Sequence, residues 1–216
     1  MTDSSWLKSV GDALLRTENI IMIVAIGILV YLLWLTNPSK TKTSAGRRPV
    51  YTITEIGVAV ALASILGMIR LYRMPQGGSV SLEMLPIFYV ALRSGGGVGI
   101  LTGLALGLVQ LLLGAYIVHP VQLLLDYPLA FAFLGVAGFF RRHQVLGIIL
   151  GGLGRFIMHV LSGVVFFGTY APEGTNVWLY SMTYNASYMI PELIICIIVM
   201  LVLGLGRSTS TSVGRG

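Results

Sequence analysis

The sequence predicts an all-α integral membrane protein, a six-helix transmembrane bundle preceded by one extra N-terminal transmembrane helix. Of the 216 residues, 56% are hydrophobic and 10% are charged, whereas an average soluble domain has about 25% charged residues. The mean hydropathy is +0.87, and long uncharged runs alternate with short polar gaps. Apolar surface in this proportion needs lipid as its solvent, so a water-soluble globule and a disordered chain are both excluded.

The net charge of the chain is +6, and most of the basic residues lie in the gaps between its apolar runs. Segment 37–50 holds four of them, and Arg141 and Arg142 lie together in a later gap. Lys and Arg collect in the cytoplasmic loops of membrane proteins, whereas a nucleic-acid binder gathers them on one folded face among aromatic residues. We therefore expect no nucleic acid as a partner, and we place segment 37–50 and the C-terminus in the cytoplasm.

The first 50 residues are predicted to form three parts. Residues 1–19 are polar to amphipathic and suit an interfacial helix. The apolar run 20–36 is just long enough to span a bilayer. Neither a basic opening segment nor a small-residue cleavage site marks this run as a signal peptide, so we expect a retained transmembrane anchor. Residues 37–50 form a polar, basic cytoplasmic linker.

Residues 51–206 are predicted to form the six-helix membrane domain, and residues 207–216 a disordered tail. The expected helical segments are 51–70, 80–93, 97–118, 121–140, 145–168 and 181–206. The second segment is short for a full crossing and contains Pro86. We therefore expect it to be tilted or re-entrant, enclosed by its neighbours.

Small residues recur four positions apart on two of these segments, which places them on one helix face. Gly99, Gly103 and Gly107 form one such face, and Ala59 and Ala63 belong to another. Small faces let helices approach closely in lipid. Packing within the domain is the better interpretation of the glycine face, whereas the alanine face suits either internal packing or contact with another protein.

Three polar side chains are predicted to meet in the outer half of the membrane. Asp126, His159 and Asn185 lie at similar depths on three consecutive segments. A charged group at the bilayer centre costs about 2.5–3.5 kcal/mol even on the more lenient insertion scale, so a retained acid normally faces a cavity or a partner. We therefore expect the carboxylate, the imidazole and the amide to line one chamber. Interhelical hydrogen bonding is the competing role for His159 and Asn185.

Aromatic residues surround these three polar groups. Tyr127 follows Asp126, and Tyr184 directly precedes the amide. A carboxylate beside aromatic faces suits a flat, cationic, hydrogen-bonding ligand, because the ring quadrupoles attract the cation and the carboxylate pairs with it. Tyr170 and Trp178 could contribute to the chamber, although both also fit an aromatic belt at the membrane interface.

Other ionisable residues are weaker candidates for the lining of the chamber. Glu83 is expected either to line it or to face water, and Arg155 and Glu192 are expected to form a structural ion pair. The sequence contains no phosphate-binding loop, zinc-ligand spacing or nucleophile elbow, so we expect no enzyme activity, cofactor or metal. Two other functions remain open: an intramembrane hydrolase that uses Asp126 and His159 around a water, and a structural subunit in which these residues only join helices.

Four stretches of the sequence resemble the thiamine-specific substrate-binding (S) subunits of energy-coupling factor (ECF) vitamin transporters. They are GGSVSLEMLPI (77–87), LLLDYPLAFAFLGVAG (123–138), RFIMHVLSGVVFFGTYAPEG (155–174) and WLYSMTYNASYMIPE (178–192). The resemblance covers approximately residues 51–205. It implies a six-helix bundle in a prokaryotic cell membrane with an outward-facing vitamin pocket. It also implies uptake only together with a membrane coupling subunit and two cytoplasmic ATPases.

The ligand-binding residues of that family are an acid–Tyr pair, a histidine, a stacking aromatic residue, a Tyr and an Asn. They fall on Asp126, Tyr127, His159, Phe167, Tyr180 and Asn185. The family's alanine motif for docking on the coupling subunit falls on Ala59 and Ala63. The family usually has Glu and Trp where this chain has Asp126 and Phe167. The resemblance therefore implies high-affinity binding of thiamine, or of a thiamine relative or precursor, with delivery by reorientation of the subunit in the membrane.

Overall fold

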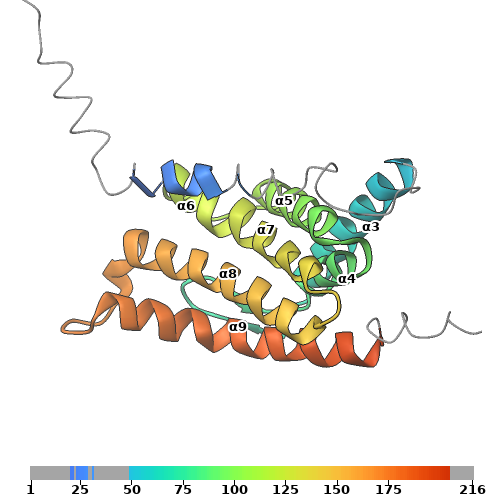
Figure 1. The fold of residues 1–216 in the computed structure, drawn as a ribbon. Coiled ribbons are helices and arrows are strands. Elements are labelled where there is room, and N and C mark those ends of the chain that lie inside the picture. The colour runs from blue at the N-terminus through green and yellow to red at the C-terminus, as the bar shows by residue number, and fades with distance from the viewer. Residues whose placement is uncertain (1–19, 22, 29–30, 32–48, 205–216) are drawn as a thin grey trace, which may run out of the picture.

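The computed structural model describes residues 20, 21, 23–28, 31 and 49–204 of the chain. The elements of the second part are α3 (Pro49–Met68), β1 (Tyr72–Arg73), β2 (Ser79–Val80), α4 (Leu85–Ser94), α5 (Gly96–Leu112), α6 (Pro120–Leu124), η1 (Leu125–Leu129), α7 (Ala130–Leu134), η2 (Gly135–Phe139), α8 (Gln144–Phe166), η3 (Gly168–Tyr170) and α9 (Val177–Val202). Long helices pack side by side in Figure 1, with α8 and α9 forming a pair. The described part of the chain is therefore mostly helical.

Four helical stretches of the described part are long and apolar enough to cross a membrane. They are Val50–Met68, Pro120–Phe139, Gln144–Phe166 and Val177–Val202. Their length and composition are those of a helical membrane protein. Because α4 and α5 are shorter, the count of six crossings after an additional N-terminal one stays a prediction.

The predicted N-terminal parts are described only in fragments. The interfacial segment 1–19, nearly all of the linker 37–50 and the tail 207–216 lie outside the described residues. Within the predicted anchor 20–36, the described residues are helical. Ala25 is 2% exposed and belongs to an apolar cluster with residues of α5, α6, η1 and α8.

A short hairpin precedes α4, where the sequence predicted a helix from residue 80. Strands β1 and β2 pair antiparallel, with Tyr72 opposite Val80. Gly77 and Gly78 in the turn have φ angles of 97° and 82°, a conformation that glycine adopts without a Cβ clash. Helix α4 begins only after this hairpin, with Pro86 in its first turn, where a missing N–H costs no hydrogen bond. The predicted start of this helix was therefore wrong.

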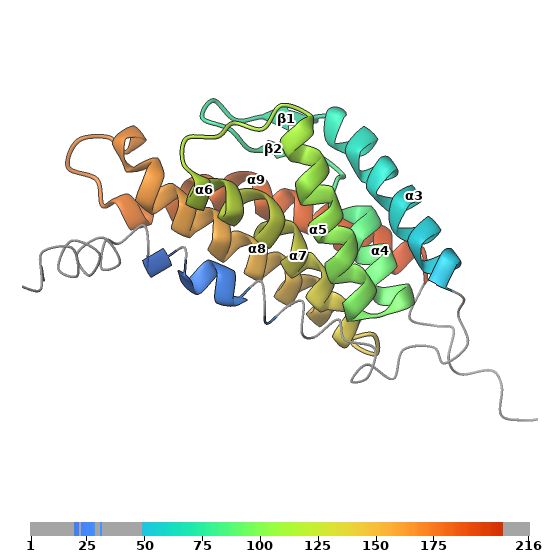
Figure 2. The ribbon, with the colours of Figure 1, turned by 90° about the horizontal axis from the view of Figure 1, so that it is seen from above.

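Helix α4 lies in the interior of the protein. Met84, just before its start, and Ile87 and Phe88 within it are completely buried. The helix contacts α3, α5 and η2, and Figure 2 shows α3 running along the outside of α4 and α5. A helix that is enclosed by other helices need not match the thickness of the bilayer by itself, which accounts for its short length.

Helix α5 packs against η1 and α7 through its glycine face. A Cβ atom on Gly103 would lie 2.1 Å from the carbonyl oxygen of Phe131, and one on Gly107 would lie 2.8 Å from the Cα of Pro128. Only glycine lets two backbones approach this closely. The glycine face therefore serves packing within the domain, as predicted.

We expect Gly103→Ala to destabilise the protein by about 1–3 kcal/mol, because the added methyl group must push α5 away from α7. Gly57→Ala is the matched control, since a Cβ atom at Gly57 meets nothing within 4 Å and alanine favours a helix. Thermal unfolding of the two purified variants in detergent measures the difference. Equal transition temperatures would contradict the close packing of α5.

The fourth predicted segment is one continuous helical stretch made of four pieces. Helix α6 passes into a single π-helical turn, η1, which holds Asp126 and Tyr127. Pro128 has no N–H for the carbonyl group four residues earlier, and the Ala130 amide donates to the Leu125 carbonyl five residues back. The stretch then continues through α7 and the tighter helix η2. Turns of the π type are frequent at functional sites.

Candidate functional site

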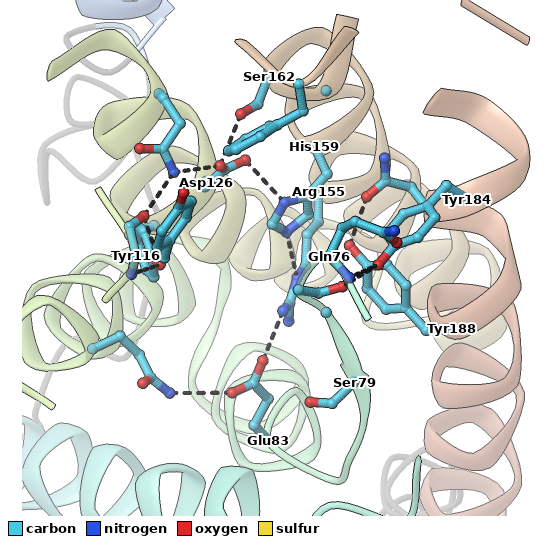
Figure 3. A pocket seen from close by; sticks show the side chains of 18 of the residues that line it. Gln76, Ser79, Glu83, Tyr116, Asp126, Arg155, His159, Ser162, Tyr184 and Tyr188 are labelled. Carbon is cyan, nitrogen blue, oxygen red and sulfur yellow. Dashed lines mark hydrogen bonds and ion pairs between the residues drawn. The ribbon is translucent and has the colours of Figure 1, made fainter. Parts of the chain in front are cut away.

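A cavity of about 290 Å³ lies between α3, the hairpin, α5, η1, α8 and α9, and Figure 3 looks into it. Its lining includes the six residues at which the sequence predicts ligand binding: Asp126, Tyr127, His159, Phe167, Tyr180 and Asn185. Three of the four further candidates, Glu83, Tyr170 and Tyr184, also line it. Trp178 does not line the cavity, and it is 51% exposed. Contact between these residues and a ligand stays a prediction.

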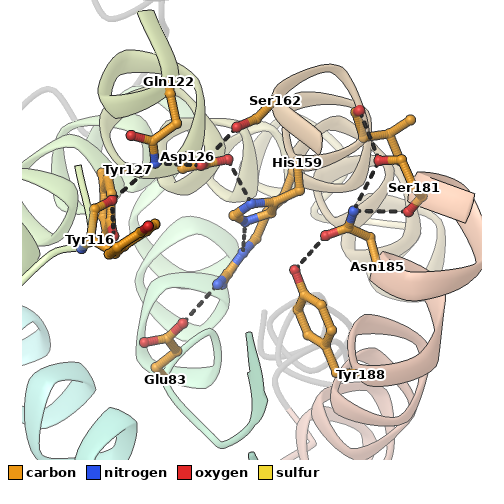
Figure 4. Close-up of polar contacts among 12 residues, drawn as sticks. Glu83, Tyr116, Gln122, Asp126, Tyr127, His159, Ser162, Ser181, Asn185 and Tyr188 are labelled. Atoms are coloured by element: carbon orange, nitrogen blue, oxygen red, sulfur yellow. Dashed lines mark hydrogen bonds and ion pairs between the residues drawn. The ribbon is translucent and has the colours of Figure 1, made fainter. Parts of the chain in front are cut away.

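Asp126 accepts hydrogen bonds on both of its carboxylate oxygens (Figure 4). Its Oδ1 atom lies 3.1 Å from Nδ1 of His159. Its Oδ2 atom accepts from Nε2 of Gln122 at 2.7 Å and from Oγ of Ser162 at 2.8 Å. Donors on α6 and α8 thus stabilise the ionised carboxylate and hold it at the cavity wall.

The contacts of His159 assign its proton. Nε of Arg155 donates to Nε2 of His159 at 3.4 Å, and a guanidinium group has no acceptor. Nε2 is therefore the acceptor nitrogen, and Nδ1 carries the hydrogen that is donated to Asp126. In this tautomer the imidazole orients the carboxylate of Asp126 by donating a hydrogen bond to it.

Arg155 pairs with Glu83, whereas the sequence predicted a pair with Glu192. Nη2 of Arg155 lies 2.7 Å from Oε1 of Glu83, and the guanidinium carbon lies 4.3 Å from the ring centroid of Phe131. Glu192 is completely buried and accepts from Oγ of Ser81 at 3.0 Å. The prediction was wrong because Glu83 reaches the cavity from the segment just before α4. The carboxylate of Glu83 offsets the positive charge of Arg155. The guanidinium group therefore adds little repulsion toward a positively charged ligand.

Asn185 is 7% exposed and is hydrogen-bonded at both ends of its amide. Its Nδ2 atom donates to the Ser181 carbonyl at 2.9 Å, and the Tyr188 hydroxyl donates to its Oδ1 atom at 2.6 Å. The acid, the imidazole and the amide therefore lie in one cavity. Asp126 and His159 contact each other, whereas Asn185 lies on the α9 wall (Figure 4).

Aromatic rings form another part of the wall. Phe167 and Tyr170 stack with their ring centroids 6.2 Å apart and an angle of 22° between the planes. Tyr116, in the loop after α5, lies 6.3 Å from Phe167 between centroids. The Tyr127 hydroxyl accepts from the Tyr116 amide at 3.0 Å and so fixes this loop. These ring faces lie on the cavity that holds the carboxylate, which suits a flat cation.

Several lining residues were not assigned to the site from the sequence. Gln122 lies four residues before Asp126, and Arg155 lies four residues before His159. That spacing places each pair on one helix face, so helical periodicity alone could have found them. Tyr116 comes from a loop, and no local pattern in the sequence marks it.

An apolar groove of about 690 Å³ lies between α3, α4 and Leu203. Ala59 lines this groove and is 6% exposed, whereas Ala63 is completely buried in the core. Glu55 and Arg93 contribute charged side chains to the lining. The predicted docking role of Ala63 is therefore corrected, because its methyl group packs inside the protein and reaches no outside surface. Ala59 is the alanine that an approaching helix could meet.

The sequence matches a protein family and two known proteins. A family model described as "Thiamine transporter protein" matches residues 53–211. The thiamine transporter ThiT of Bacillus subtilis strain 168 is 45% identical over 170 residues, which are 70% of this chain and 88% of that protein. The thiamine transporter ThiT of Lacticaseibacillus paracasei is 29% identical over 176 residues, which are 72% of this chain and 88% of that protein.

The fold also matches a solved structure. ThiT from Listeria monocytogenes superposes with a TM-score of 0.68 at 28% sequence identity, and the match covers 75% of this chain and 97% of that one. The family match begins at residue 53, so it leaves out the predicted anchor and linker. It includes all the cavity residues described above.

Proposed function

The chain belongs to the thiamine transporter protein family, and from that premise we propose that it is the thiamine-binding S subunit of an ECF-type importer. It captures the vitamin in the cavity from the outer side of a prokaryotic cell membrane and delivers it inward unchanged. It is a transport protein rather than an enzyme. The proposal rests on the position of the Asp126 carboxylate, which accepts hydrogen bonds from Gln122, His159 and Ser162 in a cavity with aromatic walls.

The chemistry of thiamine fits this cavity. Thiamine joins an aminopyrimidine to a thiazolium ring, so it offers a permanent positive charge, N–H donors and two flat rings. Asp126 and Asn185 hydrogen-bond the pyrimidine in this proposal. The rings are enclosed by the aromatic and imidazole side chains of the cavity, namely Tyr127, His159, Phe167 and Tyr180. Cation–π attraction and charge-assisted hydrogen bonds then act together on one ligand.

Uphill uptake requires partners, because binding alone releases no energy for transport. In this proposal a membrane coupling subunit and two cytoplasmic ATPases supply that energy, and the S subunit reorients in the bilayer as a rigid body. The groove between α3 and α4 is the proposed docking surface. Its small residue Ala59 lets a partner helix approach closely.

A second candidate ligand is a thiamine relative or precursor. Asp126 is one methylene shorter than Glu, which leaves more space at the carboxylate. Phe167 attracts a cation more weakly than Trp does. Both differences favour a ligand of altered size or weaker charge. The hydrolase alternative, in which Asp126 and His159 act around a water, has less support, because both oxygens of Asp126 already accept hydrogen bonds from side chains and Nε2 of His159 accepts one from Arg155.

We expect purified protein to bind thiamine with a dissociation constant below about 10 μM, or about −7 kcal/mol. Isothermal titration calorimetry is the suitable measurement, since Trp178 lies outside the cavity and its fluorescence need not respond. A parallel titration with the isolated pyrimidine and thiazole halves distinguishes thiamine from a precursor. Absence of saturable thiamine binding in folded protein would contradict the proposal.

A further inference from the structure

We propose that Tyr188 is a positioning residue that holds the amide oxygen of Asn185 in place at the cavity wall by donating a hydrogen bond to it, so that the site selects an amino group over a carbonyl group. This inference rests on the proposed function, because it concerns how the cavity recognises an aminopyrimidine. Tyr188 lies one helical turn after Asn185 on α9 and is 4% exposed. It is not among the residues at which the sequence predicted ligand binding.

The hydrogen bonds of Asn185 permit only one orientation of its amide. The Ser181 carbonyl oxygen, 2.9 Å from Nδ2, is an acceptor only, so the nitrogen end must face it. The Tyr188 hydroxyl then donates to Oδ1 at 2.6 Å. With the two ends reversed, the amide oxygen would face the carbonyl oxygen of Ser181, and two acceptors would repel each other. Figure 4 shows the amide oxygen on the Tyr188 side and the nitrogen toward Ser181.

This orientation determines what the amide offers to a ligand. The nitrogen already donates to Ser181 and points near its hydroxyl oxygen at 3.4 Å, and that hydroxyl donates to the Val160 carbonyl at 3.0 Å. The amide oxygen keeps one free lone pair beside its bond to Tyr188. Asn185 therefore presents an acceptor to the cavity, which matches an N–H group and opposes a carbonyl oxygen.

The tip of the hairpin holds the ring of Tyr188 in place. A Cβ atom on Gly78 would lie 2.6 Å from Cε1 of Tyr188. Because glycine has no side chain, the backbone of the turn packs directly against this ring. One turn earlier on α9, the Tyr184 hydroxyl accepts from the Gln76 amide at 2.8 Å and donates to the Gly77 carbonyl at 2.9 Å. These contacts hold the hairpin against α9, and the hairpin in turn keeps Tyr188 in the position from which it contacts Asn185 (Figure 3).

The test compares thiamine with oxythiamine, which carries a carbonyl in place of the pyrimidine amino group. We expect the unchanged protein to prefer thiamine by about a hundredfold, because an unpaired polar group in a buried site is costly. Tyr188→Phe keeps the ring and removes the hydroxyl, so we expect the preference to fall about tenfold, the effect of losing one buried hydrogen bond. Calorimetric titrations of both ligands give the two dissociation constants.

Tyr89→Phe is the matched control, because it also removes one tyrosine hydroxyl, whereas Tyr89 neither lines the cavity nor contacts Asn185. We expect it to change the affinity for either ligand by less than about twofold and to leave their ratio unchanged. Action through the amide is tested with Asn185→Ala, in whose background Tyr188→Phe should no longer change the ratio. A further change there would overturn the positioning role.

The outcomes separate this inference from the proposed function. If the unchanged protein binds no thiamine, both fail. If it binds thiamine and folded Tyr188→Phe keeps the full preference, only the role of Tyr188 is overturned. If Tyr188→Phe does not yield folded protein, Tyr188→Met also lacks the hydroxyl and has a flexible side chain that fills the space. The same loss of preference is then expected from Tyr188→Met, and an unchanged ratio overturns the inference.

Discussion

Asp126→Ala is expected to weaken thiamine binding by at least about a hundredfold, a loss of about 2.7 kcal/mol. The carboxylate is the charged group that accepts hydrogen bonds from the aminopyrimidine in this proposal, and a hydrogen bond to a charged group contributes about 1.5–3 kcal/mol. Asp126→Asn should lose most of the same affinity, because the amide keeps the size of the side chain and lacks its charge. Calorimetric titration with thiamine measures both variants.

Glu173→Ala is the matched control for this loss of an acid. Glu173 is exposed in the loop before α9 and does not line the cavity, so we expect its removal to change the affinity by less than about twofold. Thermal unfolding in detergent shows whether each variant is folded. If folded Asp126→Ala binds thiamine as tightly as the unchanged protein, the carboxylate is not the ligand-binding group.

Ala59→Trp is expected to reduce thiamine uptake by cells at least about tenfold, because the indole ring fills the groove between α3 and α4 and keeps a partner helix away. Binding to the purified subunit in detergent should stay within about threefold, since Ala59 lies outside the cavity lining. Uptake of labelled thiamine in cells that carry the coupling proteins, together with titration of the purified variant, measures this separation of transport from binding.

Ile65→Trp is the matched control on the same helix. Ile65 is 56% exposed and does not line the groove, so the new ring faces lipid, and both uptake and binding should be retained. If Ala59→Trp lowers binding as much as uptake, the position serves packing within the subunit. The proposed docking surface would then have to be placed elsewhere.

Much of the helical framework was predictable, because long apolar runs bounded by polar gaps leave few alternatives in lipid. The hairpin was missed because its strands are only two residues long, too short for an alternating pattern. The last helix begins at Val177, earlier than predicted, because the Asn176 side chain accepts from the amides of Trp178 and Leu179 and caps it. Caps and turns of this kind depend on local hydrogen bonds that hydropathy does not register.

The site was predictable to the extent that polar groups are costly in a membrane. That cost, together with the family resemblance, selected Asp126, His159 and Asn185, which the fold brings to one cavity. The pairing of Arg155 with Glu83 was not predictable, since the two residues are 72 positions apart and come from different elements. A charged residue's depth in the membrane can be estimated from the sequence, whereas its partner depends on how the helices pack.

The π-helical turn η1 sets how the two halves of one helical stretch are rotated relative to each other. One additional residue in a turn shifts the angular phase of the helix by about 100°, so the stretch before η1 and the stretch after it are out of register. Gln122, before the turn, lines the cavity, and so does Phe131 after it, which also packs in the core. The rotation at η1 therefore serves the cavity and the core together. A single-residue deletion within 125–129 would rotate one half against the other and damage both at once.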